Sequence, residues 1–299
     1  MKNITAWISA FRLRTLPLSF SLIIVGSALA YERHIFNWSI FSLAILTTLF
    51  LQILSNVSND YGDAVSGVDF AGRVGPERAV QSGAISQQSM KRAIIVFSIL
   101  SFISGIILLY VAYPTLGKSG FYFMLFVGIT AILAAICYTV GRKPYGYIGL
   151  GDLSVFIFFG LVGVMGSFIL YSGKFENEIL LPASSIGLLS VAVLNMNNMR
   201  DYQSDMLSGK KTLIVRIGIN NGRIYEVCVV CLAFVLLTIY AIFYGKTTQL
   251  LALIALIRFI PHLIFVCNKE NQNKLDSQLK VVSIGTLLVA ILFTIGTII

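Results

Sequence analysis

The hydrophobic positions of this chain form long unbroken runs, not the short alternating patterns of a water-soluble domain. A helix needs about 20 apolar residues to cross the hydrocarbon core of a bilayer, and runs of that length recur along the sequence. Polar or turn-forming clusters separate them. The pattern therefore predicts nine membrane-spanning helices, at about 15–32, 38–58, 92–113, 120–139, 150–171, 180–198, 224–244, 248–267 and 280–298.

The composition supports this interpretation. Hydrophobic residues make up 57% of the 299 positions and charged residues only 12%, whereas a soluble domain carries roughly 25% charged residues. We expect an all-α integral membrane bundle, with residues 1–299 forming one membrane-embedded domain and the lipid bilayer as its main partner.

The distribution of charged residues indicates how the chain is oriented in the membrane. The chain has 22 Lys and Arg against 13 Asp and Glu, a net charge of +9. With nine spans, one membrane face receives only Arg33, Lys118, Lys174 and Lys246, while Arg258 lies within a span and all other basic residues lie on the opposite face. Basic loops mark the cytoplasmic side, so the excess predicts membrane orientation and no nucleic-acid binding. We predict a cytoplasmic N-terminus and an external C-terminus.

Two of the predicted cytoplasmic loops, 59–91 and 199–223, are longer than a simple connection requires and are expected to carry function. The span before each loop ends in Asn and Asp residues. Side chains about three or four positions apart are neighbours on a helix. If the helices continue, two polar stripes form, one of Asn56, Asn59 or Asp60, and Asp63, the other of Asn197, Asp201 and Asp205.

These carboxylates and carboxamides predict a cation site. Densely packed carboxylates repel, and partial burial makes their ionisation costlier, so a cation should compensate. Oxygen ligands without His or Cys suit Mg²⁺, particularly beside a phosphate-bearing substrate. Nearby basic side chains are candidates for the remaining phosphate oxygens: Arg73, Arg78, Lys143, Arg200, Lys210 and Lys211.

The two polar stripes share a sequence pattern. Asn-x-x-x-Asp-Tyr occurs at 56–61 and again at 197–202, each time at the predicted cytoplasmic end of a span. The alternative is that these acids are ordinary solvated groups at helix ends. Two copies in matching order favour a functional site, and they hint at an internal repeat in parallel orientation.

With these motifs the chain resembles the UbiA-type prenyltransferase superfamily, and within it the branch that prenylates 1,4-dihydroxy-2-naphthoate in menaquinone synthesis. The similarity covers nearly the whole chain. The segments that carry it are 10–17, 51–67, 75–78, 143–152, 197–205 and 209–218.

The resemblance implies transfer of a polyprenyl group from polyprenyl diphosphate to the aromatic acceptor, with Mg²⁺ bridging the diphosphate. The matching positions are Asn59 and Asp63, with Asp60 adjacent, and Asp201 and Asp205 in the second motif. The general first motif has a further Asp four residues after Asp63, where this chain has Gly67 with Asp69 beyond it. The naphthoate branch shares this form, and the role of Asp69 is left open.

An aromatic acid needs a cation for its carboxylate and a flat apolar slot for its rings. Candidate acceptor-binding residues are Arg12, Tyr138, Lys143, Tyr145 and Tyr147; the alternative is that the basic ones only follow the charge bias of the cytoplasmic face.

Two other functions are alternatives to prenylation of the naphthoate. A 4-hydroxybenzoate prenyltransferase would share the Asp motifs. An anion-coupled secondary transporter would place ionisable residues near mid-membrane.

Overall fold

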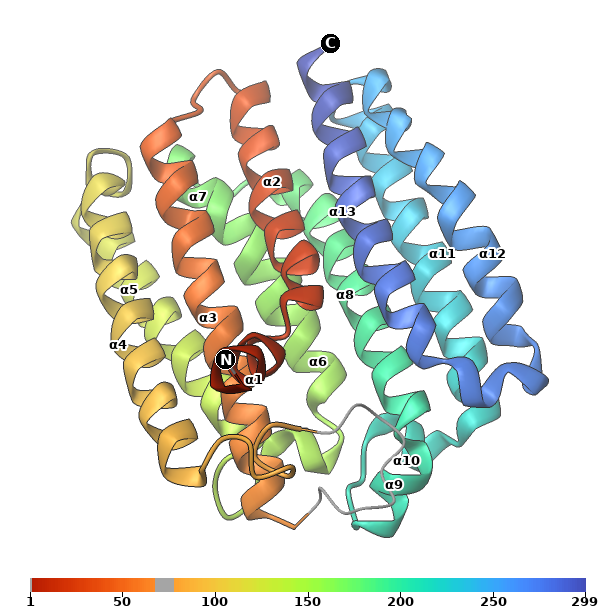
Figure 1. Cartoon of the computed structure of the whole chain (residues 1–299). Helices are drawn as coiled ribbons and strands as arrows, with labels where there is room; N and C mark the ends of the chain where they lie inside the picture. Colours follow the sequence, from red (N-terminus) through yellow and green to blue (C-terminus); the bar gives the residue numbers. More distant parts are fainter. Residues whose placement is uncertain (1, 68–77) are drawn as a thin grey trace.

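The computed structural model of the chain describes residues 2–67 and 78–299, and within them every regular element is helical (Figure 1). The helices that build the bundle are α1 (Lys2–Phe11), α2 (Leu16–Glu32), α3 (Trp38–Val65), α4 (Gln87–Val111), α5 (Tyr113–Cys137), α6 (Gly151–Val155), the π-helical η3 (Phe156–Met165), α7 (Gly166–Ser172), α8 (Leu180–Arg200), α11 (Ile219–Phe243), α12 (Leu256–Cys267) and α13 (Asp276–Ile298). Shorter elements are η1 (Leu13–Thr15), η2 (Tyr145–Ile148), η4 (Asn177–Ile179), α9 (Tyr202–Leu207), α10 (Leu213–Ile217), η5 (Thr247–Ala255) and η6 (Lys269–Lys274).

The membrane bundle is confirmed, but the count of nine spans is not. Eight helical stretches in the described part of the chain are long and apolar enough to cross a membrane. The first predicted span corresponds to α2, which has 17 residues and reaches the required length only together with α1, at a bend of 48°. By length and composition, residues 2–67 and 78–299 therefore provide eight candidate spans, or nine if that bent pair crosses as one.

Both Asp-bearing helices extend beyond the ends that hydrophobicity predicted. Asn37 caps α3 by accepting hydrogen bonds from the backbone N–H groups of Ser39 and Ile40, and the helix continues to Val65 before Gly67 turns the chain with φ of 72°. Asn56, Asn59 and Asp63 thus stand on one continuous helix. Most of the predicted loop 199–223 is also helical, because α9 and α10 fall inside it.

The second motif crosses a break between two helices. α8 ends at Arg200 and α9 begins at Tyr202, yet the Asp201 N–H donates to the carbonyl of Asn197 and the Asp205 N–H donates to that of Asp201. This helical bonding keeps Asn197, Asp201 and Asp205 in register. Thr212 then caps α10, and Gly218, with φ of 82°, turns the chain into α11.

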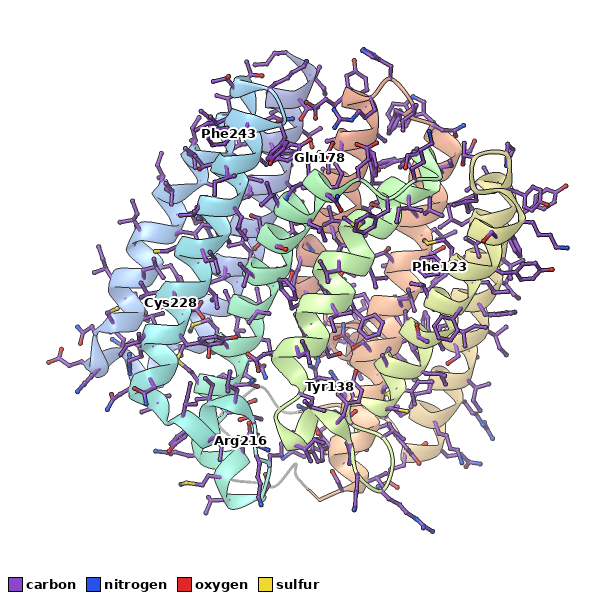
Figure 2. All side chains as sticks on the ribbon, turned by 180° about the vertical axis from the view of Figure 1, so that it is seen from behind. Phe123, Tyr138, Glu178, Arg216, Cys228 and Phe243 are labelled. Atoms are coloured by element: carbon purple, nitrogen blue, oxygen red, sulfur yellow. The ribbon has the colours of Figure 1, made fainter. Side chains whose placement is uncertain are left out.

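The core is centred on α8. In the most apolar stretch of this span, 72% of the residues are buried. Glycines let η3 approach this helix: a Cβ on Gly160 would lie 2.8 Å from the Cα of Gly187, and one on Gly163 would meet Leu22 of α2. The ends of the bundle are polar. Tyr138 and Arg216 mark the end that carries both Asp motifs, and Glu178 and Phe243 mark the opposite end (Figure 2). Which end faces the cytoplasm stays a prediction.

Candidate active site

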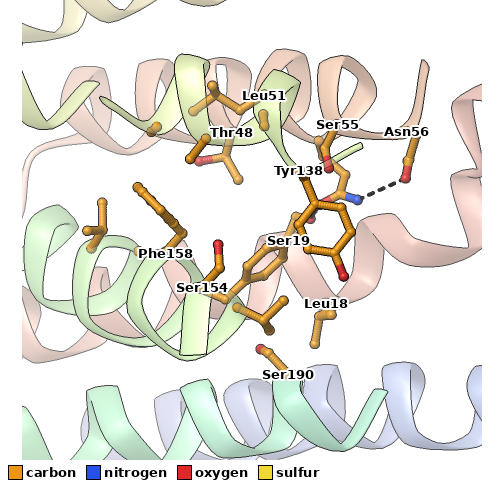
Figure 3. Close-up of a pocket in the computed structure, with 18 of the residues that line it drawn as sticks. Leu18, Ser19, Thr48, Leu51, Ser55, Asn56, Tyr138, Ser154, Phe158 and Ser190 are labelled. Carbon is orange, nitrogen blue, oxygen red and sulfur yellow. Dashed lines mark hydrogen bonds between the residues drawn. The ribbon is translucent and has the colours of Figure 1, made fainter. Parts of the chain in front are cut away.

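A cavity of about 410 Å³ runs from the Asp-bearing end into the bundle. Its polar end is lined by residues of both motifs: Asn56, Asn59, Asp63, Asn197, Asp201 and Asp205. Its deeper walls are largely apolar and come from α2, α3, α4, α5 and η3. Figure 3 shows this arrangement, with Asn56 and Tyr138 bordering the same space as Leu51 and Phe158.

Asp63 is the most heavily engaged acid of the first motif. Its carboxylate accepts from the Arg78 guanidinium and from the Tyr147 hydroxyl, and the Lys210 ammonium lies 3.0 Å away. Burial, together with the Asp63 carboxylate, raises the pKa of Tyr147, so this phenol stays protonated and keeps donating at neutral pH. Lys210 also lies over the Tyr147 ring, 4.5 Å from its centroid.

The structure places Asp60 beside the cavity and not among its lining residues. Asp60 is buried against Arg12, whose Nη2 lies 2.5 Å from the carboxylate, and the Nε of Arg78 is 3.9 Å away. Arg12 and Arg78 themselves line the cavity. The sequence grouped Asp60 with the metal ligands, whereas the structure shows it holding two cations that face the cavity.

The carboxylate of Asp201 is bound by a neighbour in the chain. Arg200 donates to both of its oxygens at 2.7 Å and also reaches Asn197 at 2.8 Å and Asp276 at 2.7 Å. Asp205 lies 3.9 Å from the Lys210 ammonium. The two motifs therefore meet through Lys210, which contacts the last acid of each.

The oxygen ligands that line the cavity can hold Mg²⁺ only together with a phosphate ligand. Within residues 2–67 and 78–299, no three His, Cys, Asp or Glu side chains are grouped closely enough to hold a metal ion alone. Mg²⁺ in proteins is commonly held by one or two carboxylates plus substrate phosphate and water. Asp63 and Asp205, with Asn59 and Asp201 also lining the cavity, provide such a partial set.

The predicted acceptor and phosphate residues divide into those that line the cavity and those that do not; Arg200, which binds Asp201, does not line it. Arg12, Arg78, Tyr138, Tyr145, Tyr147 and Lys210 line the cavity. Lys143 and Lys211 are exposed and do not line it; the Lys211 N–H is bound to the carbonyl of Tyr147. Asp69 and Arg73 lie outside the described residues, so their predicted roles stay predictions.

Some cavity residues escaped the sequence analysis. Gln52 lies one turn before Asn56, accepts from Ser19 at 2.5 Å and lines the cavity, so extending the stripe backwards would have found it. Thr139 donates to Asn59 at 3.2 Å, and Lys280 lines the cavity from α13. Neither Thr139 nor Lys280 belongs to a spacing pattern that the sequence could reveal.

One buried His–Glu hydrogen-bonding contact lies apart from the cavity. His262 Nε2 is 3.0 Å from Glu226, and Asn195 donates to the same Glu226 at 2.6 Å. All three side chains are fully buried between α8, α11 and α12, and none lines the cavity. They join the helices of the C-terminal half.

Comparison with known proteins places the chain in a family. Residues 19–295 match the UbiA prenyltransferase family, and the chain belongs to it. Two bacterial relatives are both named 1,4-dihydroxy-2-naphthoate octaprenyltransferase. The Escherichia coli protein is 49% identical over 80% of this chain and 77% of its own length; the Haemophilus influenzae protein is 42% identical over 100% and 97%.

The fold is also shared with a solved structure. A UbiA homolog from Archaeoglobus fulgidus, bound to DMAPP and Mg²⁺, superposes with a TM-score of 0.55 over 96% of this chain and 99% of that one. The two sequences are 16% identical, so this likeness supports the fold alone.

Proposed function

We propose that this chain is a Mg²⁺-dependent 1,4-dihydroxy-2-naphthoate polyprenyltransferase of the bacterial cytoplasmic membrane. It transfers a polyprenyl group from polyprenyl diphosphate to the acceptor and releases diphosphate and CO₂ to give demethylmenaquinol, which oxidises to demethylmenaquinone. The observation that carries the proposal is the shared cavity: Asp63 and Asp205, from opposite motifs, line one polar mouth that continues into an apolar interior. The names of the bacterial relatives support the acceptor.

The polar mouth suits the diphosphate of the donor. Arg78 and Lys210 are the two lining cations that contact Asp63, and both neutralise its carboxylate. In the proposed complex both cations would bind phosphate oxygens, and Asn59, Asp63, Asp201 and Asp205 would hold Mg²⁺. Bound there, Mg²⁺ supplies charge neutralisation for the departing diphosphate. The solved homolog of the same fold contains DMAPP and Mg²⁺, which supports the choice of metal and not the choice of ligands.

The deeper cavity suits an allylic cation. Loss of diphosphate leaves positive charge on the first isoprene unit, which water would capture. Apolar walls exclude water, and the rings of Tyr138 and Tyr145 line the cavity beyond the carboxylates. The electron-rich ring of the acceptor then attacks the cation, so the protein contributes mainly electrostatic stabilisation and orientation.

Arg12 is the cation best placed for the acceptor carboxylate. It lines the cavity and is fixed by Asp60, whereas Lys143, the other predicted cation, is exposed outside it. A guanidinium matches a carboxylate in a bidentate geometry. We therefore assign carboxylate binding to Arg12.

Product analysis tests the proposal. Purified protein in detergent, given Mg²⁺, a polyprenyl diphosphate and 1,4-dihydroxy-2-naphthoate, should form the prenylated naphthoquinol. Better turnover of 4-hydroxybenzoate would assign the enzyme to the other aromatic branch. Absence of product with both acceptors, together with ion-coupled anion uptake into proteoliposomes, would support the transporter instead.

A further inference from the structure

The segment 143–152 ends in an acid that has no part in the metal, diphosphate or acceptor assignments above. Asp152 is the second residue of α6, is only 8% exposed and does not line the cavity. Neither of its carboxylate oxygens makes a hydrogen bond of standard geometry with residues 2–67 or 78–299, although the Tyr225 hydroxyl of α11 approaches it. Buried polar groups are normally paired, and a buried carboxylate without donors is stabilised by taking up a proton.

Tyr138 lies between this acid and the cavity. Its ring is among the groups that line the cavity (Figure 3). Its hydroxyl lies against the start of α6, because a Cβ added to Gly151, the residue before Asp152, would be 2.8 Å from it. A Cβ added to Gly146 would meet the ring at 2.9 Å, and the Tyr145 ring packs edge-on with a centroid distance of 5.3 Å. The two glycines thus make room for the Tyr138 ring beside Asp152.

The phenol and the acid also interact through charge. Burial, followed by the charge of Asp152, raises the pKa of Tyr138, which directly follows the last residue of α5. Tyr138 therefore carries its proton at neutral pH and can pass that proton on only if it receives another. The other titratable groups that face Asp152 are Tyr225 and Glu226, both on α11.

The proposed reaction needs a proton to be removed and then returned. The acceptor enters as a carboxylate and loses this group as CO₂, so the prenyl group replaces it without any net change in protons. The ring is nevertheless most nucleophilic when the hydroxyl beside the carboxylate is ionised. A group that holds this proton during the reaction needs no exchange with water, which suits a buried acid next to the cavity.

We propose that Tyr138 takes the proton of this hydroxyl and passes its own proton to Asp152, which holds it until CO₂ has left. This inference rests on the proposed function. As the hydroxyl oxygen becomes a ketone, the ring carbon that bears the carboxylate bonds to the first carbon of the prenyl group, and the bond from that carbon to diphosphate breaks with its electron pair. The bond to CO₂ then breaks, and its electron pair restores the aromatic ring. The proton returns from Asp152 through Tyr138 to the oxygen.

Two variants interrupt this relay at its two ends. Asp152→Asn keeps the shape of the side chain and Tyr138→Phe keeps the ring. Each should lower kcat about 100-fold, while the KM for the donor and for the naphthoate stays within about twofold of wild type. The double variant should resemble either single variant, because both act in one relay.

Tyr171→Phe is the matched control. It removes another phenol of the bundle, one that is hydrogen-bonded to Ser27 and does not line the cavity. Its kcat should stay within about twofold of wild type. A wild-type kcat in Tyr138→Phe would overturn the relay, and this variant decides the matter even if Asp152→Asn does not fold.

The pH profile separates proton transfer from a structural role. In both relay variants the rate should rise with pH, because the acceptor hydroxyl then ionises without help, so the loss relative to wild type should shrink. A loss that is the same at every pH, or that appears only in KM, would overturn the relay. If the wild type itself formed no product at any pH, the proposed function would fail, which is a different result.

Discussion

The ammonium of Lys210 lies 3.0 Å from the carboxylate of Asp63 and so joins the loop after α9 to the end of α3. The same ammonium is 3.9 Å from Asp205. One cation thus occupies the space between the last acids of two motifs that are far apart in sequence. A diphosphate entering this space would bring its own negative charge. We expect the ammonium of Lys210 to bind that diphosphate.

Replacement of Lys210 should weaken use of the donor. We expect Lys210→Met to lower kcat/KM for the diphosphate donor about tenfold or more, because a charge-assisted contact to phosphate is lost. Lys211→Met is the matched control: its side chain is exposed and does not line the cavity, so its kinetics should stay within about twofold of wild type. Steady-state kinetics with varied donor check both variants, and equal losses would contradict the assignment.

Removal of the central carboxylates should stop turnover. Asp63→Asn and Asp205→Asn keep the side-chain size but remove an anionic ligand, so each should lower kcat about 100-fold or more. Glu270→Gln, on an exposed acid of η6, is the control. Chelator treatment of the wild type should abolish activity and added Mg²⁺ should restore it. Full activity in excess chelator would contradict the proposed dependence on Mg²⁺.

Arg12 and Asp60 should act as one unit on the acceptor. Arg12→Gln should raise the KM for the naphthoate about tenfold, because its carboxylate loses its cation. Asp60→Asn should have a smaller effect in the same direction. The double variant should resemble Arg12→Gln alone, since Asp60 acts through Arg12. Additive effects in this double-mutant cycle would indicate that Asp60 contacts substrate directly.

The helical stripe of the first motif could be predicted, but the direction of each side chain could not. Successive residues on a helix point about 100° apart, so the adjacent Asn59 and Asp60 cannot both face the same space. Spacing alone allowed either one to face it. The structure turns Asn59 into the cavity and Asp60 toward Arg12.

The basic residues show a second limit on what the sequence alone can predict. Lys143, Lys210 and Lys211 all belong to polar connections with the same charge bias, and that bias identifies a membrane face without identifying a site. Only the folded path between α8 and α11 brings Lys210 to Asp63. The adjacent Lys211 instead uses its backbone to bind Tyr147.

The orientation in the membrane is open to direct test. A reporter fused after Lys211 should give a cytoplasmic signal, because the basic loops lie at that end, and a C-terminal fusion should give an external signal. The same location for both fusions would mean an even number of spans between Lys211 and the C-terminus, where three are predicted.

The fate of the acceptor's carboxyl carbon distinguishes prenylation of the naphthoate from prenylation of a hydroxybenzoate. Purified protein receives Mg²⁺, octaprenyl diphosphate and 1,4-dihydroxy-2-naphthoate labelled in its carboxyl group, and both CO₂ and the lipid product are collected. We expect one labelled CO₂ for each prenyl group transferred and an unlabelled demethylmenaquinol, which oxidises to demethylmenaquinone. Retention of the label in the product, or faster prenylation of 4-hydroxybenzoate in parallel assays, would contradict it.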